Sequence, residues 1–234
     1  GGDSFYNSPT DMGVNRAGFA IIDDEVAREA AKQEVIRRYY RYRCEYVMGF
    51  ADKETVQRVE LFLNDFNIHP EDRRVVGPAW RAAREAQELN KGNEGIYCGA
   101  AIELKDGAII TGNNSPLMHA SSSLILHAIK SLADIPHKIT LLPSYITDSV
   151  RNMKTDILNE KSISLDLEET LIALSISATT NPAAQLAIEK LKELRGCEVH
   201  ITHIPTPGDE AGLRRLGVNL TSEPNFSTND LFLA

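Results

Sequence analysis

Polar side chains in the first 40 residues have the chemistry of an anion-binding site. Arg37 and Arg38 are adjacent, and the planar guanidinium of arginine donates two parallel hydrogen bonds to phosphate or carboxylate. The other polar members of this candidate ligand site are Thr10, Asp11 and Asn15. The alternative interpretation is a solvated helix flank on which Glu34 pairs with Arg38, which is common on surfaces and contributes little. Both interpretations stay open.

A second candidate ligand site lies where an expected strand leads to a helix. Residues 111–114 read TGNN, and the side-chain amides of Asn113 and Asn114 can bind a ligand, because loops at strand ends are frequent binding places. The alternative is a turn with glycine and asparagine at positive φ. His119 follows at the expected helix start, either as a ligand contact that titrates near neutral pH or as a surface or cap residue.

No residue pattern predicts a catalytic group, a metal site or a cofactor, and whether the chain is an enzyme stays open. Residues 121–123 are serines without the GxSxG pattern of a nucleophile elbow, so they fit helix capping. His200 and His203 are three apart in an expected strand, whose alternation places them on opposite faces. Asp209 precedes a short helix and is expected only to cap it.

The composition indicates a soluble protein of the cytoplasm. The 234 residues carry a formal net charge of −8, which argues against nucleic acid as a partner, since such binding needs clustered Lys and Arg. No apolar run approaches the roughly 20 residues that span a bilayer, and no secretion signal begins the chain. An odd number of distant cysteines predicts neither a disulfide framework nor a metal knuckle: Cys44, Cys98 and Cys197.

Helical periodicity dominates the first 92 residues. Apolar residues recur every three or four positions over residues 24–48, Asp52 is expected to cap a second helix that reaches residue 66, and a third helix begins near Pro70. Gly77-Pro78 is expected to break the third helix, and a fourth follows over residues 80–89. The glycine-rich residues 90–95 mark a boundary. We therefore predict a helical subdomain over residues 1–92.

Strands and helices alternate over residues 93–234. Asp106-Gly107 predicts a tight hairpin, followed at once by a long apolar helix that ends near residue 132. Further strands are expected at residues 138–142, 197–204 and 218–221. Helices are expected at residues 166–178, after the Asn181-Pro182 cap, and at residues 209–216. This alternation predicts an α/β sandwich with a mixed sheet, and α+β organisation for the whole chain.

Four segments resemble the bacterial family called domain of unknown function 1846. They are residues 8–40 and the runs DGAIITGNNS, ALSISATTNPAA and LRRLGVNLT. Members of this family are about twice as long as this chain, so the resemblance implies that the chain is their C-terminal half. It also implies an N-terminal half that carries a P-loop-type phosphate-binding loop. Because no GxxxxGK[ST] loop occurs here, no phosphate chemistry is assigned to residues of this chain.

The hairpin, the following helix and the later helix opened by proline are similar to the cytidine deaminase fold. Its zinc ligands and proton shuttle would fall in two motifs, which read His119-Ala120-Ser121 and Pro182-Ala183-Ala184-Gln185-Leu186 in this sequence. One possible ligand out of three and no proton shuttle cannot form a catalytic zinc site. The resemblance therefore implies a zinc-free, deaminase-like α/β/α subdomain over residues 93–234.

These observations predict a non-catalytic C-terminal region that forms homo-oligomers. It would form one part of a site for a nucleotide or phosphate ligand, completed by the N-terminal half of the full-length protein. The alternative is a nucleotide- or phosphate-ester hydrolase that uses Asp11, Arg37, Arg38 and His119, or a nucleotide-sensing module. Neither nucleic acid nor a membrane is expected as a partner.

Overall fold

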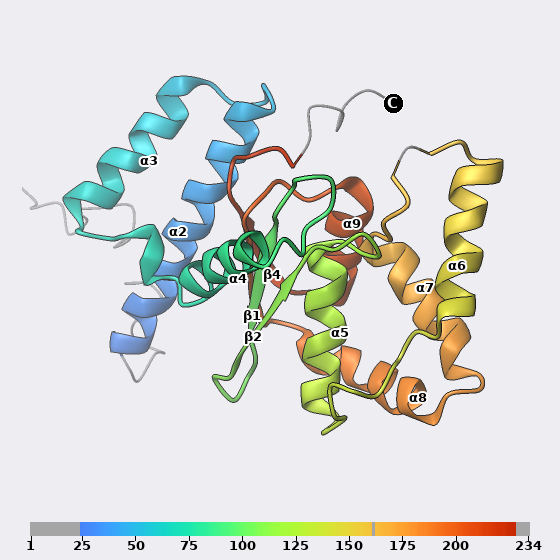
Figure 1. Cartoon of the computed structure of the whole chain (residues 1–234). Helices are drawn as coiled ribbons and strands as arrows, with labels where there is room; N and C mark the ends of the chain where they lie inside the picture. The colour runs from blue at the N-terminus through green and yellow to red at the C-terminus, as the bar shows by residue number, and fades with distance from the viewer. Residues whose placement is uncertain (1–23, 161, 228–234) are drawn as a thin grey trace, which may run out of the picture.

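Figure 1 shows a four-stranded β-sheet with helices on both faces. The structure is a computed structural model, which describes residues 24–160 and 162–227. The helices of this part are α2 (Asp24–Val47), α3 (Lys53–Asp65), α4 (Val76–Glu88), α5 (Ala120–Leu132), α6 (Ser144–Asn152), α7 (Leu167–Ala178), α8 (Pro182–Glu189) and α9 (Pro207–Leu216). Short helical turns are η1 (Pro70–Asp72), the π-helical η2 (Met153–Ile157) and η3 (Lys190–Leu194). The strands are β1 (Gly99–Glu103), β2 (Ile109–Asn113), β3 (Glu198–Ile201) and β4 (Asn219–Ser222).

The strands lie in the order β2-β1-β3-β4. β1 pairs antiparallel with β2 and with β3, so that Ala101 lies opposite both Thr111 and His200. β3 pairs parallel with β4, which requires the crossover through α9. The predicted α/β fold with a mixed sheet is confirmed.

A layer of helices covers each face of the sheet. On one face α4 packs on β1 and β2 while α2 packs on β4, and on the other face α5 covers β1 and β2. α7, α8 and α9 pack around α5 (Figure 1). Alternation along β1 serves both layers, because Ala101 contacts the α4 side and Ile102 belongs to the core on the α5 side. The predicted division at residue 92 stays a prediction, with α2 and α4 forming one of the two layers.

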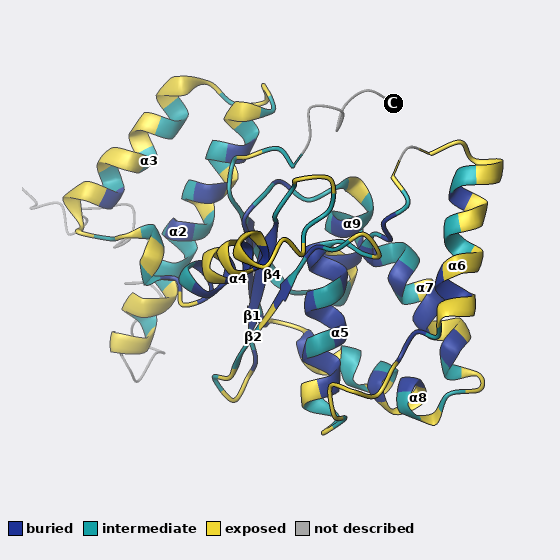
Figure 2. Cartoon of the chain, in the orientation of Figure 1, coloured by how far each residue is buried: buried dark blue, intermediate teal, exposed yellow. Residues whose placement is uncertain are grey.

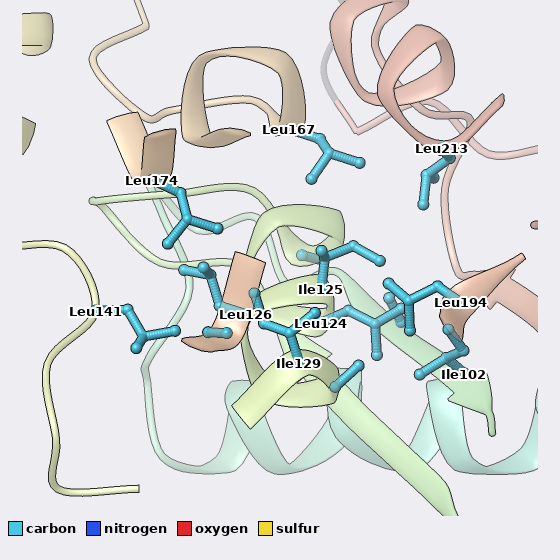
Figure 3. Close-up of a cluster of buried hydrophobic side chains, with 14 of the residues drawn as sticks. Ile102, Leu124, Ile125, Leu126, Ile129, Leu141, Leu167, Leu174, Leu194 and Leu213 are labelled. Carbon is cyan, nitrogen blue, oxygen red and sulfur yellow. The ribbon is translucent and has the colours of Figure 1, made fainter. Parts of the chain in front are cut away.

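The main hydrophobic core lies between the sheet and α5. Figure 2 shows α5 largely buried, and Figure 3 shows Leu124, Ile125 and Ile129 among leucines from α7, η3 and α9. Leu124, Ile125 and Ile129 are completely buried, as the apolar run in the sequence predicts. In the part of the chain that the structure describes, neither α5 nor any other helix is long and apolar enough to cross a bilayer.

Two glycines let helices approach the sheet closely. A Cβ added at Gly112 on β2 would lie 2.4 Å from the backbone nitrogen of Leu124 in α5. A Cβ added at Gly99 on β1 would lie 2.1 Å from the carbonyl oxygen of Ala79 in α4. Because both obstacles are helix backbone, a side chain at either position would push a whole helix away from the sheet.

We expect Gly112→Ala to lower the free energy of unfolding by about 1–3 kcal/mol, the usual cost of overpacking a core. Chemical denaturation monitored by circular dichroism measures it. Gly77→Ala is the matched control, because a Cβ there meets only the side chain of Arg81, at 3.8 Å. Equal stability of the Gly112→Ala variant and the unchanged protein would contradict close packing of α5 on β2.

Several local predictions are confirmed by the capping contacts. Asp52 accepts a hydrogen bond from the backbone nitrogen of Thr55 at 2.7 Å and begins α3. Asp166 caps α7 in a reciprocal capping box with Glu169, and Asn181 caps α8. The helix expected over residues 24–48 is α2.

Two local predictions were wrong. Residues 138–142 form turns and bends rather than a strand, because side chains satisfy their carbonyl groups: Ser177 donates to Leu141 and Asn181 donates to Thr140. Gly77-Pro78 does not break a helix but lies in the first turn of α4, where the missing N–H of proline costs no helical hydrogen bond.

Candidate functional site

A pocket of about 600 Å³ opens at the edge of the sheet where β3 ends, within the size range of small-molecule sites. α5 and α9 begin at this pocket, and residues 159–160 and 162–164 form another part of its wall. Its polar side chains are those of Asn93, Glu94, Asn114, Asn159, Glu160, Ser162, Ser164, His119, Ser121, His203, Thr206, Asp209 and Ser227. Its apolar wall includes Ile96, Cys98, Ile163, Ile201 and Ile204.

His119 and Asp209 form a hydrogen-bonded pair in the wall of the pocket. The Nδ1 atom of His119 lies 2.7 Å from Oδ2 of Asp209. The buried carboxylate also accepts from Thr206 Oγ1 at 2.8 Å, from the backbone nitrogen of Leu167 at 2.9 Å and from Ser121 Oγ. Because an ionised carboxylate only accepts, Nδ1 carries the proton in this arrangement. The pair thus fixes the ring of His119 and makes Nε2 the nitrogen available to a ligand.

The environment favours the charged form of both members of the pair. Burial tends to lower the pKa of His119, but the hydrogen bond to Asp209 and the charges of Asp209 and Asp166 outweigh it and raise that pKa above its ordinary value. Burial tends to raise the pKa of Asp209, yet the hydrogen bond and charge of His119 and the hydroxyls of Ser121 and Thr206 lower it. Both shifts act in the direction of a protonated His119 beside an ionised Asp209.

The amino-terminal ends of two helices add positive potential to this wall. His119 is the N-cap residue of α5 and makes no side-chain capping bond, while Ala120 and Ser121 of its first turn line the pocket. Thr206 caps α9 through the backbone nitrogen of Asp209. Each helix start carries a partial positive charge of roughly half an elementary charge. The negative charge of Asp209 offsets the positive charge of protonated His119. The positive potential of the helix starts is then what remains to attract an anionic ligand.

Lys154 fastens Glu160 and Ser164, two residues of the pocket wall, to the protein. Its ammonium group is buried and donates to the carbonyl of Ser164 at 3.0 Å and to Glu169 at 2.8 Å, and it lies 3.4 Å from Glu160. Lys154 belongs to the π-helical turn η2, a geometry that often marks functional sites. Glu169 and Glu160 therefore share the single positive charge of Lys154.

We expect Lys154→Met to loosen this wall, because the variant leaves Glu169 and the carbonyl of Ser164 without their buried donor. Backbone amides of residues 159–160 and 162–164 should exchange with solvent at least about tenfold faster by mass spectrometry. Lys190→Met is the control, since Lys190 forms an exposed pair with Glu193 at 2.8 Å. Unchanged exchange in residues 159–160 and 162–164 would show that Lys154 does not hold this wall.

Two family descriptions together cover nearly the whole chain. The description "Domain of unknown function DUF1846, C-terminal" matches residues 71–232, and "Domain of unknown function DUF1846, N-terminal" matches residues 1–67. The chain belongs to the DUF1846 family. Its members include a UPF0371 protein of Clostridium botulinum strain Alaska E43, 47% identical over 232 residues, and one of Clostridium tetani, 44% identical over 232 residues. Each match covers 99% of this chain and 46% of the relative, so the chain spans about half the length of these DUF1846 proteins.

The structure brings together the second predicted site of this DUF1846 chain. Asn114 and His119 both line the pocket, and the side chain of Asn113 donates to the carbonyl of Asn114 at 2.9 Å. The side-chain oxygen of Asn114 accepts from Cys98 and its amide donates to Ile96, so Asn114 fastens β2 to the chain before β1. Of these three residues, His119 is the one that offers a ring nitrogen to a ligand.

The arginines of the first predicted site lie elsewhere. Arg38 pairs with Glu34 at 3.0 Å on the exposed flank of α2, and Arg37 pairs with Glu34 and with Glu198 at 3.1 Å. α2 covers the sheet face opposite to α5, so neither arginine reaches His119 (Figure 1). Thr10, Asp11 and Asn15 lie outside the described residues.

The sequence interpretation missed the buried carboxylate of the site. Asp209 was expected only to cap a helix, but its carboxylate joins the starts of α5, α7 and α9. His119 and Asp209 are 90 positions apart, and no local pattern indicates such a contact. The strand expected over residues 197–204 ends at Ile201, so His203 lies beyond it. His200 packs on Tyr40, while His203 lines the pocket. Within residues 24–160 and 162–227, no group of three or more His, Cys, Asp or Glu residues has the geometry of a metal site.

Proposed function

We propose that this chain forms one wall of a binding site for a small anionic molecule, with His119 as the residue that contacts the anionic group. The hydrogen-bonded pair of His119 and Asp209 in a pocket of about 600 Å³ is the observation that carries the proposal. A histidine whose ring is fixed by a buried carboxylate presents its other nitrogen in a defined direction, as recognition sites require.

The ligand class follows from the charges around the pocket. Protonated His119 and the uncapped start of α5 favour a phosphate or carboxylate group. The isoleucines of the wall favour an apolar or planar body attached to that group. A nucleotide or another phosphate ester of similar size fits this description. The relatives are about twice as long as this chain. The half that this chain does not match is proposed to be the N-terminal half of the full-length protein and to complete the site.

The proposal is tested by thermal unfolding with inorganic phosphate, a sugar phosphate and a nucleoside monophosphate. A ligand of the native state raises the melting temperature in proportion to the logarithm of its concentration above the Kd. At least one probe should raise it for the unchanged protein and much less for His119→Ala. His127→Ala is the control, since His127 lies on α5 near Thr111 and outside the pocket lining. Equal shifts in all three proteins would reject the proposal.

A phosphate-ester hydrolase is the second candidate, because a histidine held by a buried carboxylate is the arrangement of a general acid or base. Arg37 and Arg38 take no part in this version, because they lie on the other face of the sheet. Turnover of p-nitrophenyl phosphate that His119→Gln abolishes and His127→Gln leaves unchanged would favour hydrolysis over binding. A nucleotide-sensing role instead predicts saturable binding without product.

Self-association is proposed through apolar side chains left exposed on α6, η2 and α7. They are Tyr145, Met153, Ile157, Leu158, Ile172 and Ile176. Light scattering during size exclusion should give a multiple of 25.9 kDa that Ile172→Asp reduces. A monomeric mass for the unchanged protein would remove self-association from the account.

A cytoplasmic location is also part of the proposal, and it is supported by three buried cysteines with free thiols. The proposal further includes a zinc-free, deaminase-like arrangement of the sheet.

A further inference from the structure

Helix α3 packs extensively on one described element only, which is α2. Leu63 is its single buried residue, and it belongs to one hydrophobic cluster with Ile36 and Tyr40 of α2 and Val76 of α4. Three large apolar side chains on α3 or at its ends remain exposed: Phe50 at 79%, Leu61 at 62% and Phe66 at 51%. We call these three residues the α3 surface. No described part of the chain buries these side chains, so they are open to another part of the protein.

The α3 surface lies at the junction between the two family domains. The N-terminal description ends at residue 67, directly after α3, and the C-terminal description begins at residue 71 in η1. α2 and α3 therefore belong to the N-terminal domain by sequence. In space, however, α2 is part of the layer on the sheet, so the sequence boundary does not separate two bodies here.

α2 is firmly joined to the sheet of the C-terminal domain. Arg37 pairs with Glu198 on β3 at 3.1 Å, the ring of Tyr40 packs 4.8 Å from that of His200, and Cys44 Sγ donates to the carbonyl of Ser222 at 3.3 Å. These contacts lie along residues 37–44 of α2. Because α3 is attached to α2, its outward side is presented in a fixed position relative to the sheet.

We propose that the α3 surface docks the rest of the N-terminal DUF1846 domain, which lies in the half of the longer family proteins that this chain does not match. The matches cover only 46% of those proteins, so the remaining polypeptide is large enough to cover a 13-residue helix. Helices α2 and α3 then belong to the N-terminal domain by sequence, and the packing of α2 on the sheet connects that domain to the C-terminal domain. This inference does not depend on the ligand proposed for the pocket.

A thiol placed at Leu61 tests the docking directly. The Leu61→Cys variant is made in two proteins. One is this chain alone, and the other is a fusion made from the 47% identical C. botulinum protein, in which this chain replaces the region that it matches. The three native cysteines are buried, so they add little labelling by a maleimide reagent. Labelling of Leu61→Cys should be at least about tenfold slower in the fusion. Leu186→Cys on α8 is the matched control, since Leu186 is 46% exposed, belongs neither to the α3 surface nor to the side chains proposed for self-association, and should react equally in both proteins.

Equal labelling rates for Leu61→Cys in the two proteins would overturn the proposal. Slow labelling in this chain alone, increasing on dilution, would also overturn it by showing that a second copy covers α3. Hydrogen exchange on the natural C. botulinum protein gives a second measurement that needs no fusion. The segment matching α3 should exchange more slowly there than in this chain, and equal exchange would again reject docking at α3.

Discussion

Replacing Arg73 by methionine should lower the free energy of unfolding by about 3–5 kcal/mol, the usual cost of removing one partner of a buried charge pair. Arg73 is 1% exposed, and its guanidinium pairs with the carboxylate of Glu198. It also donates to Thr221 Oγ1 at 2.9 Å and to the carbonyl groups of Val199 at 3.0 Å and Asn219 at 2.6 Å. The substitution removes these contacts from β3 and β4, although Glu198 keeps Arg37 and the Val199 carbonyl keeps the hydroxyl of Thr221. The methionine fills a similar volume.

Arg38→Met is the control for this loss of charge. Arg38 pairs with Glu34 at the surface of α2, where such pairs contribute roughly 0.5 kcal/mol. Urea denaturation of both variants measures the difference. Similar stabilities for the Arg73 and Arg38 variants would mean that Arg73 does not hold β3 and β4 together.

Replacing Asp209 by asparagine should have the second large effect, again about 3–5 kcal/mol in the free energy of unfolding. The buried carboxylate accepts four hydrogen bonds, and the amide can accept on one atom only. Without the negative charge, burial dominates and the pKa of His119 should fall below its ordinary value of about 6.5. Asp148→Asn is the control, because Asp148 is half exposed and forms a surface pair with Arg151 at 3.5 Å.

The effect of Asp209→Asn should depend on pH with a defined sign. The folded-state pKa of His119 is raised, so the protonated pair stabilises the protein fully below about pH 6.5 and loses this contribution as the pH rises through the raised pKa. The stability difference between the unchanged protein and the variant should therefore be larger at pH 6 than at pH 9. A larger difference at pH 9 would contradict the charge assignment of the pair.

The fold of this chain was largely predictable because its signals are local. Asp106-Gly107 predicts the hairpin, and Asn181-Pro182 predicts the start of α8 through capping that involves neighbouring residues only. The expected strand at residues 138–142 failed because its apolar residues Leu141 and Leu142 are buried by the core, while its carbonyl groups bond side chains. Apolar pattern alone cannot distinguish those two ways of burying a segment.

The site was predictable only in part, because some of its residues are brought together by contacts between distant parts of the sequence. His119 and Asn114 could be chosen from their place between β2 and α5, which is a local feature. Asp209 and Lys154 could not, since their partners lie far along the chain or across a loop. Arg37 has the right chemistry for an anion, yet Glu198 from the sheet neutralises it, and nothing near Arg37 in sequence indicates that contact.

Imidazole ¹⁵N NMR during a sulfate titration is the most direct test of the proposed site. Sulfate keeps its charge between pH 5 and 9, and the six histidines of the chain provide internal controls. The account predicts a saturable shift of the Nε2 resonance of His119 at pH 6, no comparable shift for His127, and weaker binding as the pH rises through the raised pKa of His119. Equal shifts for His119 and His127, or binding that strengthens with rising pH, would contradict an anion site at the His119–Asp209 pair.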